Sequence, residues 1–385
     1  MCPLKEAARD APHHIALLSK EGSLTFSELD QYVDRVEVES PITPAHPPTP
    51  LLIASLFAAW RRGKSLFPIN PRLPQRPTLT AAPPRSLLLL TSGSTGTPKI
   101  AVLSLENLLA NARGAIPALD LRPNDQWRLN LPLYHVGGIG IVLRCVLARA
   151  TIVLDDHPNI THLSCVPTQL YRATPVYRHL RCLLVGGAPI PSYPFPHMTT
   201  YGLTEMGSMV TLNGKVLPER EVRLAEDGEI WVRGPCLFQG YVGEAPLQGW
   251  FATGDLGRME NGHLIIEGRK DWMFISGGEN IQPEEIEREL LALPEVLEAV
   301  VLPKDDPEFG KRPVAFIRAL HAFNLKQMQV ALSHRLPKYK IPIALYLVDE
   351  IPQKNGFKTD RFILAELIKN QIDLNISGQK KSPYL

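Results

Sequence analysis

Residues 87–99, LLLLTSGSTGTPK, decide the fold of this chain. Four consecutive leucines predict a buried strand, and the small residues after them predict a loop fixed to its end. Gly93 and Gly96 can take backbone conformations that a side chain would forbid, so successive N–H groups can turn toward one anion. Lys99 adds a positive charge. A plain flexible connector is the alternative, but the leucine run and the lysine favour a phosphate-holding loop.

Hydroxyl groups in this loop add further donors for an anion. The spacing differs from a Walker A loop, which ends in Gly-Lys-Ser/Thr directly on a helix. The candidates for phosphate binding are Thr91, Ser92, Gly93, Ser94, Thr95, Gly96 and Lys99.

Composition limits the kinds of partner. The 385 residues include 41 Lys plus Arg and 39 Asp plus Glu, a formal charge of +2, which predicts no nucleic-acid or membrane-surface binding. The five cysteines are dispersed and fit reduced thiols rather than disulfides or a zinc site. The longest apolar stretch, Leu51 to Trp60, is too short to span a bilayer. We expect a cytoplasmic protein without stable membrane insertion, and the sequence leaves open whether it forms a homo-oligomer.

Short apolar segments alternate with helical ones over the first half of the chain. Residues 151–154, 162–166 and 180–185 fit strands, whereas Leu51 to Trp60 fits a buried helix. This alternation is typical of a parallel sheet covered by helices on both faces. Another helix is expected near residue 30, with Ser27 as its N-cap.

The pattern changes from Glu221 onward to short alternating strands with turns, which predict a small antiparallel sheet or barrel. An amphipathic helix then begins after Pro283, as expected in a compact α+β domain. We therefore predict an α/β fold with a large N-terminal domain, residues 1–269, of doubly wound, mostly parallel sheets plus the antiparallel sheet. A small mobile α+β domain, residues 270–370, and a polar tail, residues 371–385, are expected to follow.

Six motifs carry a resemblance to a known family. In order they are TSGSTGTPK at 91–99, YGLTE at 201–205, GWFATGDLG at 249–257, GRKD at 268–271, SGGENIQPEEIE at 276–287 and NGFKTDR at 355–361. Together they resemble the adenylate-forming (AMP-binding) superfamily of acyl-CoA synthetases, luciferases and peptide-synthetase adenylation domains. The resemblance runs from Leu24 to Ala365 and so covers nearly the whole chain.

The resemblance implies a two-step reaction. A carboxylate attacks the α-phosphate of ATP to give an acyl-adenylate, and the thiol of coenzyme A then displaces AMP to give an acyl-CoA thioester. Because the first step joins two anions, it needs cations and donors around the triphosphate. The implied partners are a small carboxylic acid, ATP, Mg²⁺ and coenzyme A.

The resemblance also implies roles for residues near the nucleotide. The loop at 91–99 would hold the β- and γ-phosphates, Thr204 would donate to the α-phosphate, and Glu205 would bind Mg²⁺ through oxygen. Tyr201 would stack on adenine, with Gly186 and Gly187 letting the base lie close to the backbone. Outside this ordered set, Tyr201 and Glu205 would be read as an ordinary turn.

Further implied roles concern the ribose, the hinge and the adenylation step. Asp255 would accept both ribose hydroxyls with Arg269 in support, and Asp271 would be the hinge of the small domain. Taken alone, Arg269 and Asp271 would be a solvated charged turn. Lys358 would stabilise the charge that grows between the carboxylate and the α-phosphate, although Phe357 separates it from Gly356 and Lys354 is a nearby competitor.

The second step would use the face carrying Gly277 and Gly278, which allow a backbone turn near the pantetheine tunnel. For the acid, the informative segment is 131–150, where His135 precedes two glycines and Arg144 lies inside an apolar run. A buried guanidinium should snorkel, pair with a carboxylate or face an anionic ligand. Additional candidates for the acid pocket are Ser164, Thr168 and Gln169.

An Arg144 that faces an anion would suit an acid with two carboxylates, one activated and one held. With segments 164–172, 184–191 and 309–315, the chain looks most like the o-succinylbenzoate–CoA ligases of menaquinone biosynthesis. One alternative is an acyl-CoA synthetase for another aryl or fatty carboxylate. Another is a non-catalytic nucleotide-binding remnant, because residues 37–86 are compressed, although no residue type of the nucleotide site is missing.

Overall fold

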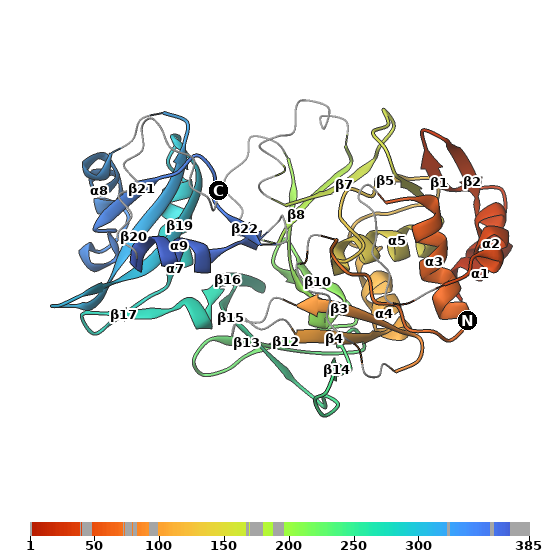
Figure 1. The fold of residues 1–385 in the computed structure, drawn as a ribbon, viewed down its shortest axis with the longest axis horizontal. Helices are drawn as coiled ribbons and strands as arrows, with labels where there is room; N and C mark the ends of the chain where they lie inside the picture. The colour runs from red at the N-terminus through yellow and green to blue at the C-terminus, as the bar shows by residue number, and fades with distance from the viewer. Residues whose placement is uncertain are drawn as a thin grey trace.

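The computed structural model describes most of the chain, and these parts extend along one long axis (Figure 1). The described residues are 2–38, 40, 48–71, 73, 79, 83–91, 99–166, 169, 180–187, 196–321, 324–354 and 358–369. Residues up to about 270 form the right-hand part of Figure 1, and the later ones form the left-hand part. The expected polar tail, residues 371–385, lies outside the described residues.

The helices follow the apolar spacing of the sequence. Their bounds are α1 Pro3–Asp10, α2 Phe26–Arg35, α3 Pro50–Arg61, α4 Leu105–Ala115, α5 Val136–Ala148, α7 Pro283–Leu291, α8 Leu325–Ser333 and α9 Arg361–Lys369. The buried helix expected at Leu51 to Trp60 is confirmed as α3. The N-cap expected at Ser27 is wrong, because Thr25 accepts the Glu28 N–H and the Glu28 carboxylate accepts the Thr25 N–H in a capping box.

A mixed nine-stranded sheet forms the centre of the right-hand part, in the order β11-β10-β9-β8-β7-β5-β6-β1-β2 among the described residues. Its strands are β1 Ile15–Ser19, β2 Gly22–Thr25, β5 Gln126–Arg128, β6 Thr151–Val153, β7 His162–Cys165, β8 Cys182–Gly186, β9 Met198–Leu203, β10 Ser208–Leu212 and β11 Lys215–Val216. Neighbours from β9 to β1 are all parallel, and the outer strands are antiparallel. The predicted parallel centre is confirmed.

The leucine run forms a strand of another sheet. Strand β3 Ser86–Thr91 pairs antiparallel with β4 Lys99–Ser104, and β4 pairs with β14 Gly240–Tyr241. The register sets Thr91 opposite Lys99. The loop that carries the glycines and hydroxyls therefore connects the two strands of a hairpin, and it leaves and re-enters the sheet at fixed points.

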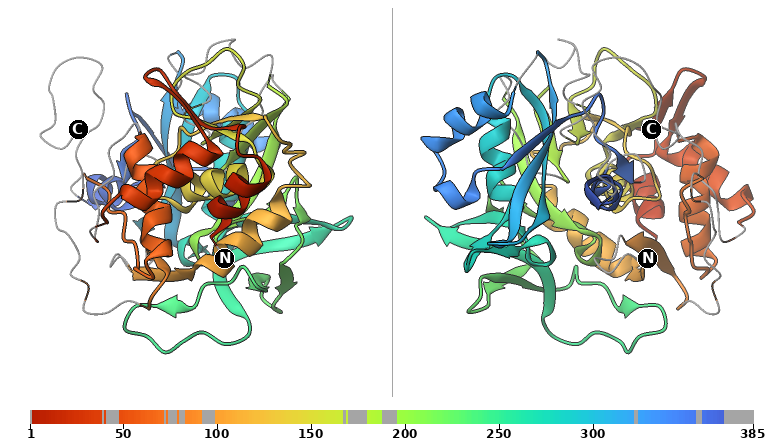
Figure 2. Two further views of the ribbon diagram at one scale, coloured as in Figure 1. Left: turned by 90° about the vertical axis from the view of Figure 1, so that its right-hand side faces the viewer. Right: turned by 60° about the vertical axis from the view of Figure 1, so that its left-hand side comes forward.

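The rest of the fold is mainly antiparallel, as the change of pattern at Glu221 predicts. The four-stranded sheet contains β12 Glu221–Leu224, β13 Glu229–Arg233, β15 Phe251–Glu260 and β16 His263–Arg269. After it come the hairpin β17 Phe274–Ser276 with β18 Glu279–Ile281, the sheet β19 Val296–Asp306, β20 Gly310–Ala319 and β21 Ala344–Leu347, and the hairpin β22 Gln353–Lys354 with β23 Lys358–Thr359. Strands β20 and β21 are an exception, because they pair in parallel. The right-hand view of Figure 2 looks almost along α9, which follows β23.

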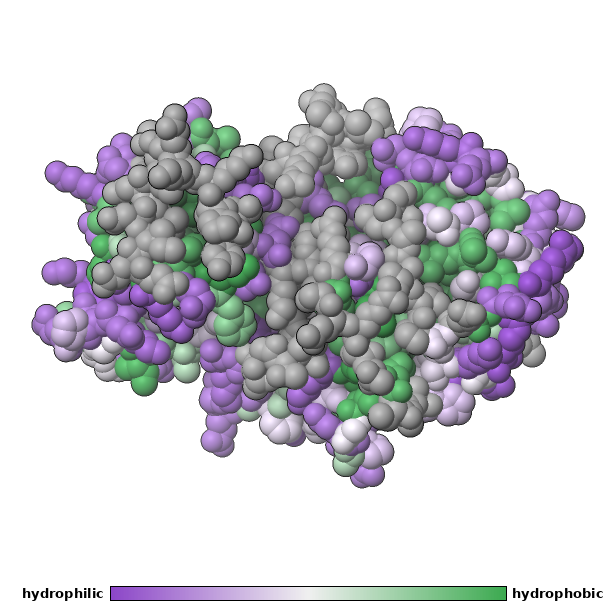
Figure 3. All heavy atoms as spheres, in the orientation of Figure 1, coloured by the Kyte–Doolittle hydropathy of each residue, from purple (hydrophilic) through white to green (hydrophobic). Residues whose placement is uncertain are grey.

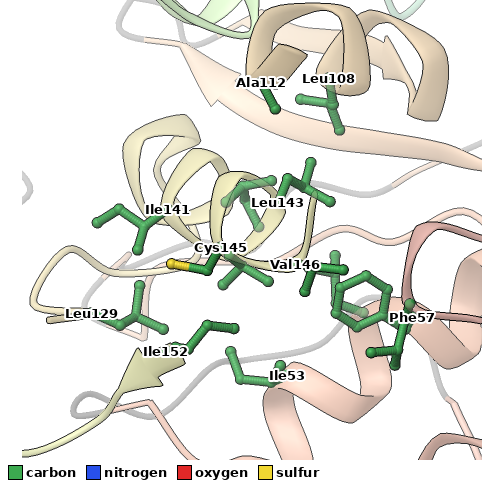
Figure 4. Packing of buried hydrophobic residues seen from close by; sticks show 14 of the residues in the cluster. Ile53, Phe57, Leu108, Ala112, Leu129, Ile141, Leu143, Cys145, Val146 and Ile152 are labelled. Carbon is green, nitrogen blue, oxygen red and sulfur yellow. The ribbon is translucent and has the colours of Figure 1, made fainter. Parts of the chain in front are cut away.

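The buried clusters also divide near residue 270. The largest cluster gathers around α5, which is apolar on all sides and packs against α3, α4 and the central sheet (Figure 4). Two clusters consist only of residues after 270. On the face shown in Figure 3, hydrophilic side chains lie mainly along the outer edges of both parts.

No helix within the described ranges is both long and apolar enough to cross a bilayer.

Candidate functional site

The ends of the phosphate-loop hairpin are well defined. Thr91 closes β3, and its hydroxyl donates to the carbonyl of Lys99 at 3.4 Å. Lys99 opens β4, and its ammonium lies 2.9 Å from the Glu244 carboxylate and 4.7 Å from the centroid of the Tyr241 ring. The other predicted loop residues lie outside the described residues; they are Ser92, Gly93, Ser94, Thr95 and Gly96.

Glu205 lies in a short 3₁₀ turn, Thr204–Met206, directly after β9. The turn ends at Gly207, whose φ of +68° suits a glycine. Glu205 is only 9% exposed, and the Tyr241 hydroxyl donates to its Oε1 at 2.8 Å. Burial, together with this carboxylate, raises the pKa of Tyr241, so the phenol stays protonated and donates.

Glu205 fits a magnesium ion that is also bound by phosphate. Its Oε2 accepts no hydrogen bond from any described residue and so remains available to a cation. Within the described ranges there is no group of three or more His, Cys, Asp or Glu that could hold a metal by itself. Mg²⁺ commonly binds one or two carboxylates together with substrate phosphates.

Asp255 is held from two sides. The Tyr201 hydroxyl donates to its Oδ2 at 2.6 Å, and Arg269 Nη1 donates to its Oδ1 at 2.9 Å. Asp255 and Arg269 face each other in the register of β15 and β16. Arg269 Nη2 also donates to Asp271 at 2.9 Å, so one guanidinium connects both carboxylates. Burial, reinforced by Asp255, raises the pKa of Tyr201, so this phenol is also a donor at neutral pH.

The two glycines at the end of β8 differ in their surroundings. A Cβ on Gly186 would lie 2.6 Å from Thr200 Cγ2, so the packing of β8 on β9 already requires glycine there. Gly187 has a φ of +87° and lies 3.6 Å from Val166 by the same measure. The predicted role of both in seating the adenine stays a prediction.

The residues predicted for the acid pocket come from three elements. His135 is the N-cap residue of α5, and its ring centroid lies 4.7 Å from that of Tyr134. Ser164 is buried on β7, where its carbonyl accepts from Asn130 at 2.6 Å. Gln169 Oε1 accepts the Val166 N–H at 3.1 Å. Thr168 lies outside the described residues.

Arg144 is buried on α5 and is 2% exposed, which excludes snorkelling, the first of the three alternatives. Its Cζ lies 5.2 Å from the centroid of the Trp127 ring, and Nη1 donates to the Met209 sulfur at 3.0 Å. Its Nε is buried without a hydrogen-bond partner among the described residues, none of which pairs a carboxylate with it. Burial lowers the pKa of Arg144 to about 10, and the nearby Arg220 acts in the same direction.

Arg220 shows how a buried arginine in the same region can be satisfied. It donates to the carbonyls of Met209 at 2.6 Å and Asn111 at 2.9 Å, and to that of Pro218. Among the described residues, the head group of Arg144 donates only to a thioether and lies over an indole ring. These contacts exclude snorkelling and a carboxylate partner among the described residues, and the expected anionic ligand of Arg144 stays a prediction.

The predicted adenylation lysine lies on the last hairpin. Lys354 and Lys358 are paired residues of β22 and β23, so the backbone brings the two candidates directly opposite each other. The hairpin extends from the left-hand part toward the middle of the molecule (Figure 1). Arg361, at the start of α9, fixes the chain just beyond it through the buried Glu287 at 2.6 Å.

Gly277 and Gly278 form the turn between β17 and β18, with φ of +57° and +88°. The Gly277 N–H donates to the Phe309 carbonyl at 2.9 Å, and a Cβ on Gly277 would lie 2.8 Å from the Phe309 ring. Glycine is therefore required at this turn by both conformation and packing.

Two residues of the site, Tyr241 and Glu244, were absent from the sequence-based predictions. Both lie in or just after β14, and they contact Glu205 and Lys99, which are 36 and 145 residues away in sequence from their respective partners. No local pattern marks such pairs, because Tyr241 and Glu244 resemble any strand end followed by a turn.

Comparisons with known families match most of the chain. The model of the AMP-binding enzyme family matches residues 80–242, and that of the AMP-binding enzyme C-terminal domain matches residues 285–358.

Among curated proteins, the chain is similar to several bacterial 2-succinylbenzoate–CoA ligases. It is 36% identical to that of Salmonella typhimurium over 312 residues, covering 73% of this chain and 68% of the relative. It is 37% identical to that of Escherichia coli over 317 residues, covering 74% and 69%. The enzyme of Haemophilus influenzae is 37% identical over 326 residues, covering 75% and 72%.

Solved structures with the same fold include a variant of MenE from Escherichia coli with bound OSB-AMS. Its TM-score is 0.81 at 30% identity, covering 96% of this chain and 98% of that chain. The o-succinylbenzoate coenzyme A synthetase (MenE) from Bacillus subtilis, in complex with ATP and magnesium ion, has a TM-score of 0.81 at 23% identity, covering 94% and 99%. At that identity the second structure shows the fold alone.

Proposed function

The chain belongs to the AMP-binding enzyme family, and we propose that it is an ATP-dependent acid–thiol ligase that converts 2-succinylbenzoate to its coenzyme A thioester, a step of menaquinone biosynthesis. The proposal is supported by 2-succinylbenzoate–CoA ligases at 36–37% identity that align with more than two thirds of their length. It is also supported by the E. coli MenE structure, which shares 30% identity and holds OSB-AMS.

The observation that carries the choice of acid is the environment of Arg144. A guanidinium that is 2% exposed, with a buried Nε and no oxygen acceptor among the described residues, is costly unless an anion completes it. 2-Succinylbenzoate has two carboxylates, so one can be activated while Arg144 holds the other. A fatty acid has only the carboxylate that is activated, so it would provide no second carboxylate for Arg144. The acid pocket further includes His135, Ser164, Thr168 and Gln169.

In the adenylation step, the chain supplies cations and donors around two reacting anions. Lys99 and the loop at 91–96 hold the β- and γ-phosphates, and Thr204 donates to the α-phosphate. Lys358 is the residue that stabilises the negative charge growing as the new bond forms. Asp255 receives the ribose hydroxyls, with Arg269 fixing its orientation at 2.9 Å.

Glu205 is the residue that would hold magnesium, through its available carboxylate oxygen. Bound Mg²⁺ neutralises phosphate charge and so assists attack at the α-phosphate. Tyr201 packs its ring against the adenine, next to Gly186 and Gly187.

The thioester step requires a different arrangement of the two domains, residues 1–269 and 270–370. Asp271 is the hinge, and Gly277 with Gly278 offers a side-chain-free surface to the pantetheine arm. The proposed compartment is the cytoplasm, which supplies ATP and coenzyme A and would keep the five free cysteines reduced.

A coupled pyrophosphate assay tests the function. The full chain is incubated with ATP, Mg²⁺ and a panel of mono- and dicarboxylic aryl acids, with and without coenzyme A. We expect pyrophosphate release with 2-succinylbenzoate, formation of the thioester only when coenzyme A is present, and loss of release in Lys358→Ala with nucleotide binding retained. Absence of release with every acid would refute the proposal.

A further inference from the structure

Tyr241 connects the two charged groups that face the triphosphate. Its hydroxyl donates to Glu205 Oε1 at 2.8 Å, and the Lys99 ammonium lies 4.7 Å from the centroid of its ring. The same aromatic side chain therefore contacts both the proposed ligand of the metal and the proposed ligand of the phosphates, which lie 106 residues apart.

The backbone around Tyr241 fixes this arrangement. Strand β14 pairs with β4, with Tyr241 opposite Ala101, so Tyr241 is anchored to the strand that begins at Lys99. On the other side, the N–H of Phe238 donates to the Glu205 carbonyl at 2.8 Å, and the Phe238 ring packs edge-on against Tyr241 at 4.9 Å. Both the main chain and the side chain of Glu205 are thus held by the same short segment.

The hydrogen bond from Tyr241 decides which oxygen of Glu205 is available. A carboxylate in water can rotate and present either oxygen, but with Oε1 engaged by the phenol only Oε2 remains open within the described residues. Partners that orient a ligand side chain in this way tune metal affinity without touching the metal.

We propose that Tyr241 is a positioning residue that aims Glu205 at a divalent cation and, through its ring, holds Lys99 at the edge of the phosphate loop. This inference rests on the proposed function for the identity of the reaction, but its geometry concerns only the cation and the nucleotide. Tyr241 itself contacts no reacting atom.

A merely structural Tyr241 would have different consequences. Loss of its hydroxyl would then leave a buried carboxylate with one fewer donor and lower the melting temperature, while the affinity for a cation stayed unchanged. The phenylalanine variant keeps the ring, the Phe238 contact and the stacking of Lys99. It therefore isolates the hydrogen bond to Glu205.

The test measures binding of Mn²⁺, as a probe for Mg²⁺, to the full chain in the presence of α,β-methylene-ATP. The signal of free Mn²⁺ in electron paramagnetic resonance gives the affinity without turnover. We expect Tyr241→Phe to weaken Mn²⁺ binding about ten-fold, in line with lost partners of metal ligands. The lost hydrogen bond lowers the melting temperature under either role, so the Mn²⁺ affinity is the deciding measurement. Tyr346→Phe is the matched control, because Tyr346 stacks on Phe316 at 4.8 Å in the other part of the molecule.

A second arm asks whether Tyr241 acts through Glu205. In the Glu205→Gln background, adding Tyr241→Phe is expected to cause no further loss of Mn²⁺ affinity, because the oriented carboxylate is already gone. Fully additive losses, or a Tyr241→Phe chain that binds Mn²⁺ like the parent, would overturn the inference.

The pyrophosphate assay separates this inference from the proposed function. If the parent chain released pyrophosphate and Tyr241→Phe bound Mn²⁺ normally, the inference alone would be wrong. If no acid supported release but Mn²⁺ binding still depended on Tyr241 through Glu205, the proposed function would be wrong and the inference would stand.

Discussion

Arg144 and Arg361 are two largely buried arginines, one in each part of the molecule, and each lies 5.2 Å from the centroid of a tryptophan ring. Arg361 also donates to the Glu287 carboxylate at 2.6 Å and the Val301 carbonyl at 2.8 Å. Arg144 donates only to the sulfur of Met209 among the described residues. Arg361 is thus neutralised by a carboxylate of the protein, whereas Arg144 has no such partner among the described residues.

The difference separates structure from recognition. Arg361 has its counter-ion within the protein, so its charge holds α9 to α7 and β19 and has no need of a ligand. The guanidinium of Arg144 lies beside the largest core cluster and has no oxygen acceptor among the described residues. A buried cation of the second kind is stabilised only when something else supplies the anion.

The largest expected effect is on the reaction rate when Arg144 is replaced. We expect Arg144→Met to lower kcat/KM for 2-succinylbenzoate about 1000-fold, because truncating one member of a buried charge pair is strongly unfavourable. Two matched acids, each lacking one carboxylate, are 4-oxo-4-phenylbutanoate and 2-butanoylbenzoate. The one that keeps the activated carboxylate should react equally in parent and variant. Equal losses for 2-succinylbenzoate and for this reactive monoacid would contradict a role in holding the second carboxylate.

Removing Arg361 should instead affect stability. Arg361→Met leaves Glu287 as a buried carboxylate without its cation, so we expect the free energy of unfolding to fall by roughly 3 kcal/mol. Urea unfolding followed by tryptophan fluorescence measures this, with Trp272 beside Arg361 as the local reporter. The double variant Glu287→Gln, Arg361→Met should recover part of the loss. An unchanged midpoint in the single variant would show that the pair is dispensable.

The Arg361 variant also carries a pH signature. Burial raises the pKa of Glu287, and Arg361 opposes that rise. Without Arg361, the folded-state pKa of Glu287 should rise further above the unfolded value. A raised carboxyl pKa gives stability that is present below the unfolded pKa and is lost as the pH rises through the folded pKa. The deficit should therefore be smaller at acidic than at neutral pH.

The stability of Arg144→Met should change in the opposite direction. Burial lowers the pKa of Arg144 from its ordinary value to about 10, and at 1.36 kcal/mol per unit this corresponds to about 3 kcal/mol of unfavourable interaction with the charged form. Because methionine fills the site imperfectly, we expect a net gain of about 1–2 kcal/mol in the free energy of unfolding without ligand.

The sign of the pH dependence checks that explanation. A lowered pKa means that the charged arginine destabilises the folded chain at every pH below about 10, and that the effect fades as the pH rises from there toward 12.5. The advantage of Arg144→Met should thus be narrower at pH 11 than at pH 8. A gap that stayed constant would indicate that packing, not charge, is responsible.

The smallest effect is expected at the exposed pair. Lys99 and Glu244 have side chains that are 45% and 51% exposed. Glu244→Gln removes the internal competitor for the Lys99 ammonium, so ATP should bind about two-fold tighter at low salt and equally at high salt. Isothermal titration with α,β-methylene-ATP measures the affinity. A weaker affinity would mean that Glu244 orders Lys99 rather than competing with phosphate.

Local patterns in the sequence predicted the elements well. The leucine run is a strand, Leu51 to Trp60 is a helix, and the segments at 151–154, 162–166 and 180–185 form parallel strands of one sheet, with β5 between the first two. Those signals lie within a few residues, where side-chain spacing directly reflects backbone geometry. The Ser27 cap failed by two residues because Thr25, with Glu28 three residues later, completes a reciprocal capping box that single-residue preference does not weigh.

For the site, the sequence predicted which residues take part but not the contacts around them. Motifs indicated Glu205, Asp255 and Arg144 by residue type, but not what surrounds them. The contacts of Tyr241 with Glu205 and of Trp127 with Arg144 depend on tertiary packing, which no spacing rule contains. For the same reason, the sequence left snorkelling open for Arg144, whereas the packing around α5 excludes it.

Gly140 makes room for the guanidinium of Arg144 within the helix α5. It lies one turn before Arg144 on α5, and a Cβ there would come within 2.7 Å of Nη2 of the guanidinium. A mid-helix glycine weakens a helix by about 1 kcal/mol relative to alanine, and the charge beside it is unfavourable as well. Two such choices in a single turn are a patch of local frustration in an otherwise consistent core. A larger side chain at position 140 would displace the guanidinium, so under the proposed role of Arg144 the choice of acid depends on both positions of this helical turn.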